Sequence, residues 1–156
     1  MPAPNSPSAV RLEIADGGIA VLTLDQPGSR ANTLGRPVMA QLEKAMADLQ
    51  ARKDVRGLIL VSGKPAMFIA GADLNELGGP RPEPEQIKTL VRRGLDLIAA
   101  IEKLAYPTVA AIDGACMGGG LELALGFDYR VAGTPPKTEL GLPEVKIGLF
   151  PGLGGT

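Results

Sequence analysis

The chain carries three consecutive glycines, at positions 118–120, directly before the helix-forming segment LELAL, whose only charged residue is Glu122. A glycine inside a helix costs up to about 1 kcal/mol relative to alanine. At the start of a helix, however, the first backbone N–H groups lack a partner within the helix, and the helix dipole makes them good donors to a ligand. The glycines either let a ligand approach these donors or only permit tight packing of the helix against a strand.

The same order of a buried strand, glycines and a helix start recurs at residues 69–72 and 117–120, and less clearly at 153–155. A phosphate is one ligand that such donors can bind. However, the sequence contains neither a GxxxxGKS/T motif nor a GxGxxG run with a ribose-binding acid. Two N–H groups that converge on one oxygen from separate segments would instead form an oxyanion hole.

Two carboxylates are candidates for acid–base chemistry. Glu122 lies in the first turn of the expected helix, where an acid also stabilises the helix dipole. Glu144 lies in GLPEVKIG, between proline and apolar residues, and is alternatively a solvated loop acid. Over one apolar pocket the two groups would divide the roles of acid and base. Because the chain has no histidine, Ser–His and Cys–His nucleophile pairs and histidine metal ligands are excluded.

The other polar candidates have mainly structural interpretations. Asp73 follows Ala72 and is expected to cap the short helix that comes next. Lys64 and Arg30 lie in expected loops, where they either meet a phosphate or are only solvated. Cys116 is the single cysteine, and its apolar surroundings indicate a core thiol rather than a nucleophile.

Strands and helices alternate along the chain, which predicts an α/β fold with a largely parallel sheet. The expected strands are 10–16 and 19–25, joined as a hairpin through two glycines, and then 57–63, 107–114 and 127–133. Apolar residues at helical spacing predict long helices over 36–52 and 87–105. Residues 26–34 are expected to be a loop, 67–79 a strand end, glycine turn and short helix, and 79–85 a linker. The sequence shows no internal repeat.

Composition limits the functional classes. With 156 residues, 45% of them hydrophobic, the chain is long enough for one domain with a buried core. A net charge of −1, three Phe, two Tyr and no Trp argue against a nucleic-acid partner. No stretch approaches the ~18 apolar residues of a membrane span. The single cysteine suits a reducing compartment, so we expect a cytoplasmic protein whose Pro- and Ser-rich residues 1–9 form a disordered tail.

Three motifs together resemble the enoyl-CoA hydratase/isomerase family, the crotonases: FIAGADLNEL (68–77), AAIDGACMGGGLELAL (110–125) and GLPEVKIGLFPGLGGT (141–156). The likeness begins near Val10, so residues 10–156 are expected to be the N-terminal core of such a domain. It implies the ClpP-like fold of repeated β-β-α units wound as a superhelix, truncated at its C-terminal side. The segments DQPGSRANTL and KPAMFIAGADL are most similar to the N-terminal hydratase part of the multifunctional fatty-acid oxidation α subunit.

The resemblance implies a role for individual residues. The N–H groups of Ala72 and Gly119 would form the oxyanion hole for the thioester carbonyl of an acyl-CoA. Glu122 would hold the water and Glu144 would donate a proton to C2. The further substrate-binding residues implied are Ala70, Gly71, Asp73, Gly118, Gly120 and Pro143. The implied reaction is hydration of a trans-2-enoyl-CoA to a 3-hydroxyacyl-CoA in β-oxidation, with double-bond isomerisation as a possible second activity. No metal is implied, and no cofactor, because coenzyme A is part of the substrate.

The family domain continues beyond the GGT motif with helices that complete the acyl pocket, cover the CoA and build trimer contacts. We therefore expect that a C-terminal portion is missing here. The resemblance implies a homotrimer or hexamer, or a thiolase subunit as partner within a multifunctional complex. Alternatives are another crotonase reaction, such as thioester hydrolysis or decarboxylation, and a non-catalytic acyl-CoA-binding fragment.

Overall fold

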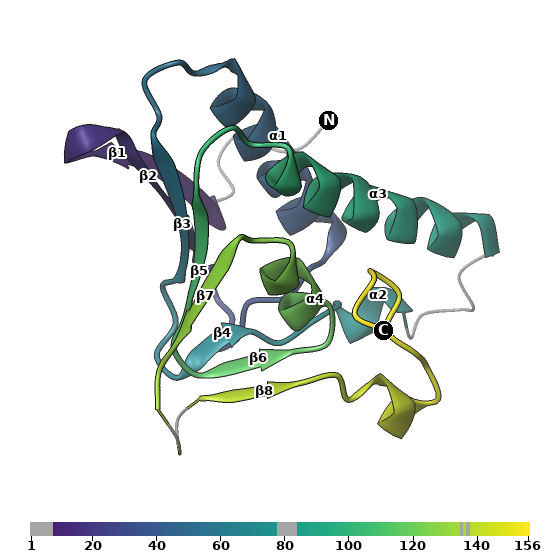
Figure 1. Ribbon diagram of the computed structural model, residues 1–156. Helices are drawn as coiled ribbons and strands as arrows, with labels where there is room; N and C mark the ends of the chain where they lie inside the picture. Colours follow the sequence, from purple (N-terminus) through teal and green to yellow (C-terminus); the bar gives the residue numbers. More distant parts are fainter. Residues whose placement is uncertain (1–7, 78–83, 135, 137) are drawn as a thin grey trace.

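The computed structural model describes residues 8–77, 84–134, 136 and 138–156 (Figure 1). The strands are β1 (Val10–Ala15), β2 (Ile19–Leu24), β3 (Gly57–Ser62), β4 (Met67–Ile69), β5 (Thr108–Ile112), β6 (Ala115–Met117), β7 (Tyr129–Ala132) and β8 (Glu139–Gly141). The helices are α1 (Arg36–Ala51), α2 (Leu74–Leu77), α3 (Pro84–Glu102) and α4 (Gly119–Leu125), with 3-10 turns η1 (Asp16–Gly18) and η2 (Glu144–Ile147).

The strands form two sheets, one in the order β1-β2-β3-β5-β7 and a smaller one in the order β4-β6-β8. The expected hairpin of β1 and β2 is antiparallel, and the pairs that follow it within the described residues are parallel. Gly17 and Gly18 form the hairpin turn with φ angles of 78° and 80°, a backbone region that favours glycine. The predicted α/β class with a largely parallel sheet is confirmed.

After β2 the described chain repeats one structural unit: a strand of the large sheet, a strand of the small sheet, then a helix. β3 and β4 precede α2 and α3, β5 and β6 precede α4, and β7 and β8 precede η2. This is the β-β-α repeat that the resemblance implied, although the sequence shows no repeat. Because β4, β6 and β8 are adjacent and parallel, the segments that follow them meet at one edge of the small sheet.

Two parts of the fold differ from the sequence expectation. The strands β6 and β8 were not predicted as separate elements, because a strand of three residues is too short to show a periodicity. The helix expected over 87–105 runs instead from Pro84 to Glu102 and so begins inside the expected linker, since proline is favourable in the first helical turn. The rest of that linker, residues 79–83, and residues 1–7 of the expected tail lie outside the described residues. The expected disorder does not extend to residue 9, because Ala9 is buried and donates its N–H to Gln41 Oε1 at 2.9 Å.

The core lies between the large sheet and the two long helices, α1 and α3, which pack against each other (Figure 1). Leu22, Leu58 and Leu60 from the strands meet Leu49 from α1 and Leu97 from α3, and each is at most 3% exposed. Complete burial of one such leucine contributes about 1.5–3 kcal/mol relative to leaving it in water. In the described part of the chain, no helix has the length and apolar character needed to span a membrane.

Candidate active site

Two backbone amides lie side by side where β4 and β6 end. A Cβ placed on Gly119 would be 3.9 Å from the backbone nitrogen of Ala72, and one placed on Gly71 would be 3.6 Å from the nitrogen of Gly119. The chain turns at Gly71 with a φ of 105°, a conformation that favours glycine. Among the described residues, no acceptor is bonded to the N–H of Ala72 or of Gly119. The predicted pair of donors is therefore present, adjacent and free to bind an oxygen.

The carboxylate of Glu144 lies over the glycine run. Gly118 donates its N–H to the Gly141 carbonyl at 2.9 Å, which holds the end of β8 beside the start of α4. Pro143 follows, half-buried, and η2 begins with Glu144. A Cβ on Gly118 would be only 2.8 Å from the Glu144 Oε1 atom. The other carboxylate oxygen, Oε2, is buried and has no hydrogen-bond partner within the described structure.

The second carboxylate, that of Glu122, is 4% exposed and lies in the first turn of α4. Its Oε1 atom accepts backbone N–H bonds from Leu153 at 2.7 Å and from Gly155 at 3.0 Å. The Leu153 side chain also lies against the glycine run, since a Cβ on Gly119 would be 3.7 Å from its Cδ1 atom. Residues 153–155 thus cover Glu122 and close one side of the site.

The glycine run combines the two roles that the sequence left open. A Cβ on Gly120 would be 2.7 Å from both Cβ and the carbonyl oxygen of Ile69, so this glycine permits tight packing of α4 on β4. Gly119 presents a free N–H, and Gly118 makes room for the Glu144 carboxylate. Three of the four predicted groups, the two amides and the Glu144 carboxylate, therefore lie around the glycine run. The Glu122 carboxylate is bonded to the backbone of Leu153, whose side chain lies against the same run.

A sequence model of the enoyl-CoA hydratase/isomerase family matches residues 15–156, most of the chain. The chain belongs to this family. The chain is also similar to solved structures: DspI of Pseudomonas aeruginosa superposes with a TM-score of 0.84 at 30% identity, over 99% of this chain and 60% of that one. An enoyl-CoA hydratase of Bacillus anthracis gives 0.86 at 30%, over 95% and 55% of the two chains. One of Thermoplasma volcanium gives 0.84 at 28%, over 94% and 56%. This crotonase-family chain thus spans less than two thirds of each of these relatives.

The remaining predicted contact residues of this crotonase-family chain lie around the first amide. Ala70 donates its N–H to the Asn32 carbonyl at 2.8 Å. Asp73 is half-buried beside the start of α1. A Cβ placed on Gly35 there would be 3.4 Å from the Asp73 Cβ atom. At the same helix start, Arg36 donates its backbone N–H to the Glu76 carboxylate at 3.0 Å.

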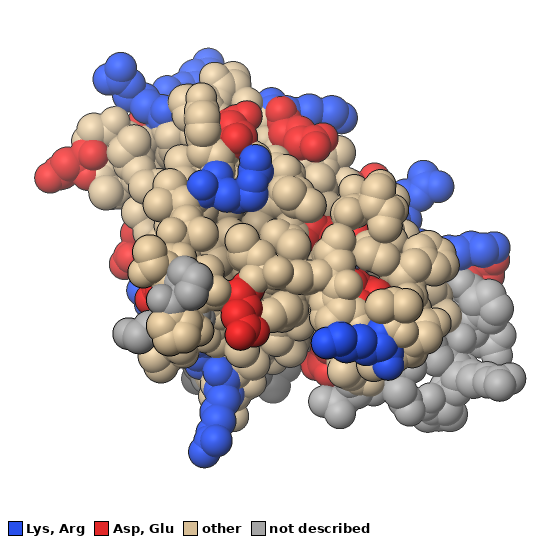
Figure 2. Space-filling view, turned by 60° about the horizontal axis from the view of Figure 1, so that its bottom comes forward, with Lys and Arg blue, Asp and Glu red and all other residues tan. Residues whose placement is uncertain are grey.

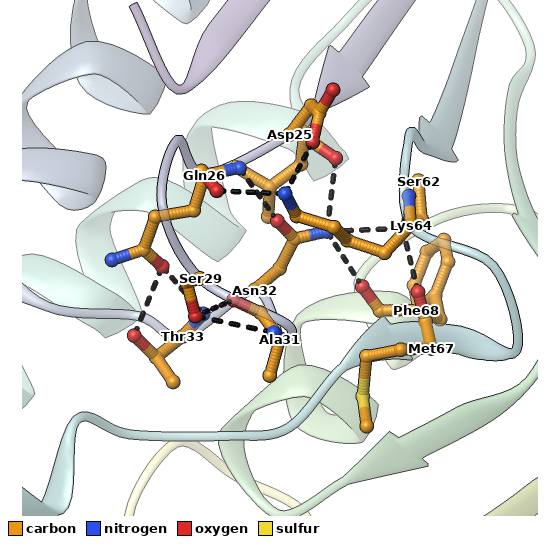
Figure 3. A network of polar contacts seen from close by, with 11 residues as sticks. Asp25, Gln26, Ser29, Ala31, Asn32, Thr33, Ser62, Lys64, Met67 and Phe68 are labelled. Atoms are coloured by element: carbon orange, nitrogen blue, oxygen red, sulfur yellow. Dashed lines mark hydrogen bonds and ion pairs between the residues drawn. The ribbon is translucent and has the colours of Figure 1, made fainter.

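The loop at residues 26–34 forms a polar network that the sequence reading missed (Figure 3). Asn32 is fully buried at the centre of this network. The sequence did not indicate this, because asparagine in a loop is typical of an exposed turn. Lys64 is held in the network by an ion pair of 2.6 Å with Asp25 and by a bond of 2.7 Å to the Gln26 carbonyl. Arg30 is exposed and forms no ion pair among the described residues. Of Lys64 and Arg30, the two loop cations considered as phosphate ligands, Lys64 is thus already bound within the protein and Arg30 has no ion-pair partner in the described part of the chain.

Cys116 is confirmed as a core thiol. It is 0% exposed, and burial raises the pKa of its thiol to about 12. The thiol therefore stays protonated at neutral pH and is a poor nucleophile. Within the described residues, no group of His, Cys, Asp or Glu side chains is arranged to hold a metal ion.

The surface beyond Glu144 is apolar. The lower part of Figure 1, which includes β8, comes forward in Figure 2, where most of the face is uncharged and single Lys, Arg, Asp and Glu side chains are scattered over it. Leu140, Val145 and Phe150 are between 51% and 81% exposed. A separate hollow of about 350 Å³ lies between the starts of α1 and α3, lined by Arg36, Glu85, Gln86, Thr89, Leu90 and Arg93. None of the four predicted groups lines this hollow, so we place the chemistry at the glycine run.

Proposed function

We propose that this chain forms the carbonyl-binding and acid–base part of an enoyl-CoA hydratase site, which hydrates a trans-2-enoyl-CoA to a 3-hydroxyacyl-CoA. The observation that carries this proposal is the placement of the free amides of Ala72 and Gly119 and the Glu144 carboxylate around the glycine run, with buried Glu122 in the first turn of the helix that follows. Membership of the enoyl-CoA hydratase/isomerase family supports the substrate class, an acyl thioester of coenzyme A.

The two amides would bind the thioester carbonyl oxygen. As a nucleophile adds to C3, electrons move through C2 onto this oxygen, and the N–H groups stabilise the enolate charge that develops there. One donor of this kind contributes about 10²–10³ in rate. Gly118 and Gly71 matter because a side chain at either position would occupy the approach to the donors.

The two acids would handle the water. Glu122 holds the water molecule near C3, because the Leu153 and Gly155 amides fix its Oε1 atom and leave Oε2 for a ligand. The carboxylate pair takes one proton as the water oxygen bonds to C3, and Glu144 delivers a proton to C2. The substrate gains one water in total, and the pair returns to its starting protonation. No metal or separate cofactor takes part in this proposal.

Isomerisation is a second candidate, favoured by one observation. The Glu144 Oε2 atom is buried without a partner among the described residues, so a single carboxylate is available to move a proton between C4 and C2 of an enoyl thioester. We also propose that Ala70, Asp73, Gly120 and Pro143 line the substrate path. The chain spans 55–60% of the relatives compared. For the whole protein we propose a place in cytoplasmic β-oxidation, likeness to the multifunctional α subunit, and assembly as a trimer or hexamer or with a thiolase partner.

The test is the loss of enoyl thioester absorbance when the chain is mixed with crotonyl-CoA. We expect turnover by the unchanged chain and a loss of at least about 10²-fold in kcat for Glu122→Gln and for Glu144→Gln. Glu139→Gln is the matched control, because Glu139 is an exposed acid in β8, the strand that comes directly before the turn with Glu144. Binding of a CoA thioester without turnover would instead favour the non-catalytic fragment. A different product in mass spectrometry would indicate another crotonase reaction.

A further inference from the structure

The side chain of Asn32 is 0% exposed and makes hydrogen bonds with both ends of its amide (Figure 3). Its Nδ2 atom donates to the Leu24 carbonyl at 2.9 Å, to Ser62 Oγ at 3.0 Å and to the Phe68 carbonyl at 3.1 Å. Its Oδ1 atom accepts the N–H of Gln26 at 2.9 Å. One side chain thus joins the end of β2, the end of β3 and strand β4 to its own loop.

The backbone beside Asn32 runs along the segment that follows β4. The Asn32 carbonyl accepts the N–H of Ala70 at 2.8 Å, and Leu34 donates its N–H to the Gly71 carbonyl at 2.8 Å. Leu34 and Ala72 form an isolated parallel bridge. Residues 32–34 therefore act as a short extra strand that holds the backbone on both sides of residue 71.

This short strand also reaches the second amide. The Leu34 Cδ1 atom would be 3.6 Å from a Cβ on Gly119, so the same residue contacts the start of α4. Gly71 has the freest backbone in the segment, with a φ of 105°, and its position depends on what holds it from outside. In this structure the backbone hydrogen bonds from residues 32 and 34 hold it in place.

We propose that Asn32 is a positioning residue for the thioester-binding amides. Its buried side chain fixes residues 32–34 against β4, and those residues set the direction of the Ala72 N–H relative to that of Gly119. The inference rests on the proposed function, and Asn32 itself does not touch the substrate. A buried amide that loses its partners is costly, so only a side chain with this donor and acceptor pattern satisfies the site.

The first test does not require activity. Amide hydrogen exchange is measured for Ala70 and Leu34 in the unchanged chain, in Asn32→Ala and in Thr33→Val. Thr33→Val is the matched control, because it removes the Thr33 Oγ1 bond to Gln26 Oε1 in the same loop and leaves the contacts with β4. We expect at least about tenfold faster exchange of both amides in Asn32→Ala only, with Leu58 in β3 still protected.

The second test measures carbonyl polarisation. A chromophoric enoyl-CoA, such as a cinnamoyl thioester, is expected to shift its absorbance to longer wavelength when both amides bind its carbonyl oxygen. For Asn32→Ala we expect this shift to be lost and the kcat for crotonyl-CoA to fall about tenfold to a hundredfold, with KM changed by less than about threefold. Thr33→Val should keep the shift and the rate. A purely structural role would instead lower the amount of active protein and leave the shift of the folded fraction unchanged.

Ser62→Ala is the milder variant for Asn32, because it removes one of three acceptors of the Asn32 Nδ2 atom and leaves the Leu24 and Phe68 carbonyls. It also removes the bonds of the Ser62 hydroxyl with the Met67 carbonyl and the Lys64 N–H. Ser62→Ala should speed the exchange of the Ala70 and Leu34 amides and lower kcat, each by a smaller factor than Asn32→Ala. If Asn32→Ala does not fold, the result for Ser62→Ala decides whether the network positions the amides. Wild-type exchange at Ala70 and Leu34, or an unchanged absorbance shift, in folded Asn32→Ala or Ser62→Ala overturns the inference. If the unchanged chain neither shifts nor hydrates the thioester, the proposed function fails, and the exchange result alone decides what Asn32 does.

Discussion

The carboxylate of Glu144 occupies the space that a side chain at Gly118 would fill, with its Oε1 atom 2.8 Å from the position of a Cβ there. Gly118 also has a φ of 53° and a ψ of −130°, a conformation that residues with a side chain rarely adopt. The residue before the second amide is thus restricted by its own backbone and by the acid that faces it.

Gly118→Ala is therefore expected to move Glu144 away from the site and to tilt the Gly119 N–H. We predict a fall in kcat of at least about 10²-fold in the crotonyl-CoA assay, the range for loss of one oxyanion donor. Gly17→Ala is the control, because Gly17 has a φ of 78° in the β1–β2 turn and no atom within 4 Å of an added Cβ. It carries the backbone strain without the clash. Equal activity of the two variants would contradict the role of Gly118.

Burial of Cys116 predicts a thiol that does not react in the folded protein. Because burial raises its pKa to about 12, the folded state binds the proton more tightly than the unfolded state. The stability that this provides is complete below the ordinary thiol pKa and is lost as the pH rises toward 12. We expect no labelling by Ellman's reagent at pH 8 until urea unfolds the chain. In Cys116→Ala, the free energy of unfolding should fall less steeply between pH 9 and 11; an equal slope would count against this effect.

The two long helices are joined by an ion pair with two hydrogen bonds. Arg93 in α3 donates from Nε and Nη2 to the Glu43 carboxylate in α1, at 2.7 and 2.8 Å, and the bond with Glu43 raises the pKa of Arg93. Both side chains are about one-third exposed, at 33% and 37%, so water weakens the pair. Arg93→Lys keeps the charge and loses the paired geometry, and we predict a loss of about 0.5–1 kcal/mol in the free energy of unfolding by urea.

Arg92→Lys provides the control for that change, since Arg92 is exposed in the same helix and forms no ion pair among the described residues. A double-mutant cycle with Glu43→Gln should assign the loss to the pair. A zero coupling energy would show that this ion pair adds nothing to the packing of the two helices.

Local patterns in the sequence predicted the elements that have a clear period or a turn signal. The apolar spacing of α1 gave a helix over 36–52, against Arg36–Ala51 in the structure, and the paired glycines placed the β1–β2 turn correctly. The short strands β6 and β8 lacked any such signal. β6 pairs with the edge of β4 and β8 pairs with β6, and both pairings join residues far apart in the chain.

The chemical types at the site can be read from the amino-acid sequence: glycines before a helix, two carboxylates, no histidine, and three motifs that together resemble one family. Which of these groups lie close together depends on the folded arrangement of the sheets. The parallel order of β4, β6 and β8 brings the residues after each strand to one edge, which places the Ala72 amide beside Gly119 and Glu144 over Gly118. The buried contacts of Asn32, and the amides of Leu153 and Gly155 on Glu122, join distant segments. A local pattern cannot report such contacts, because they exist only once the sheets have formed.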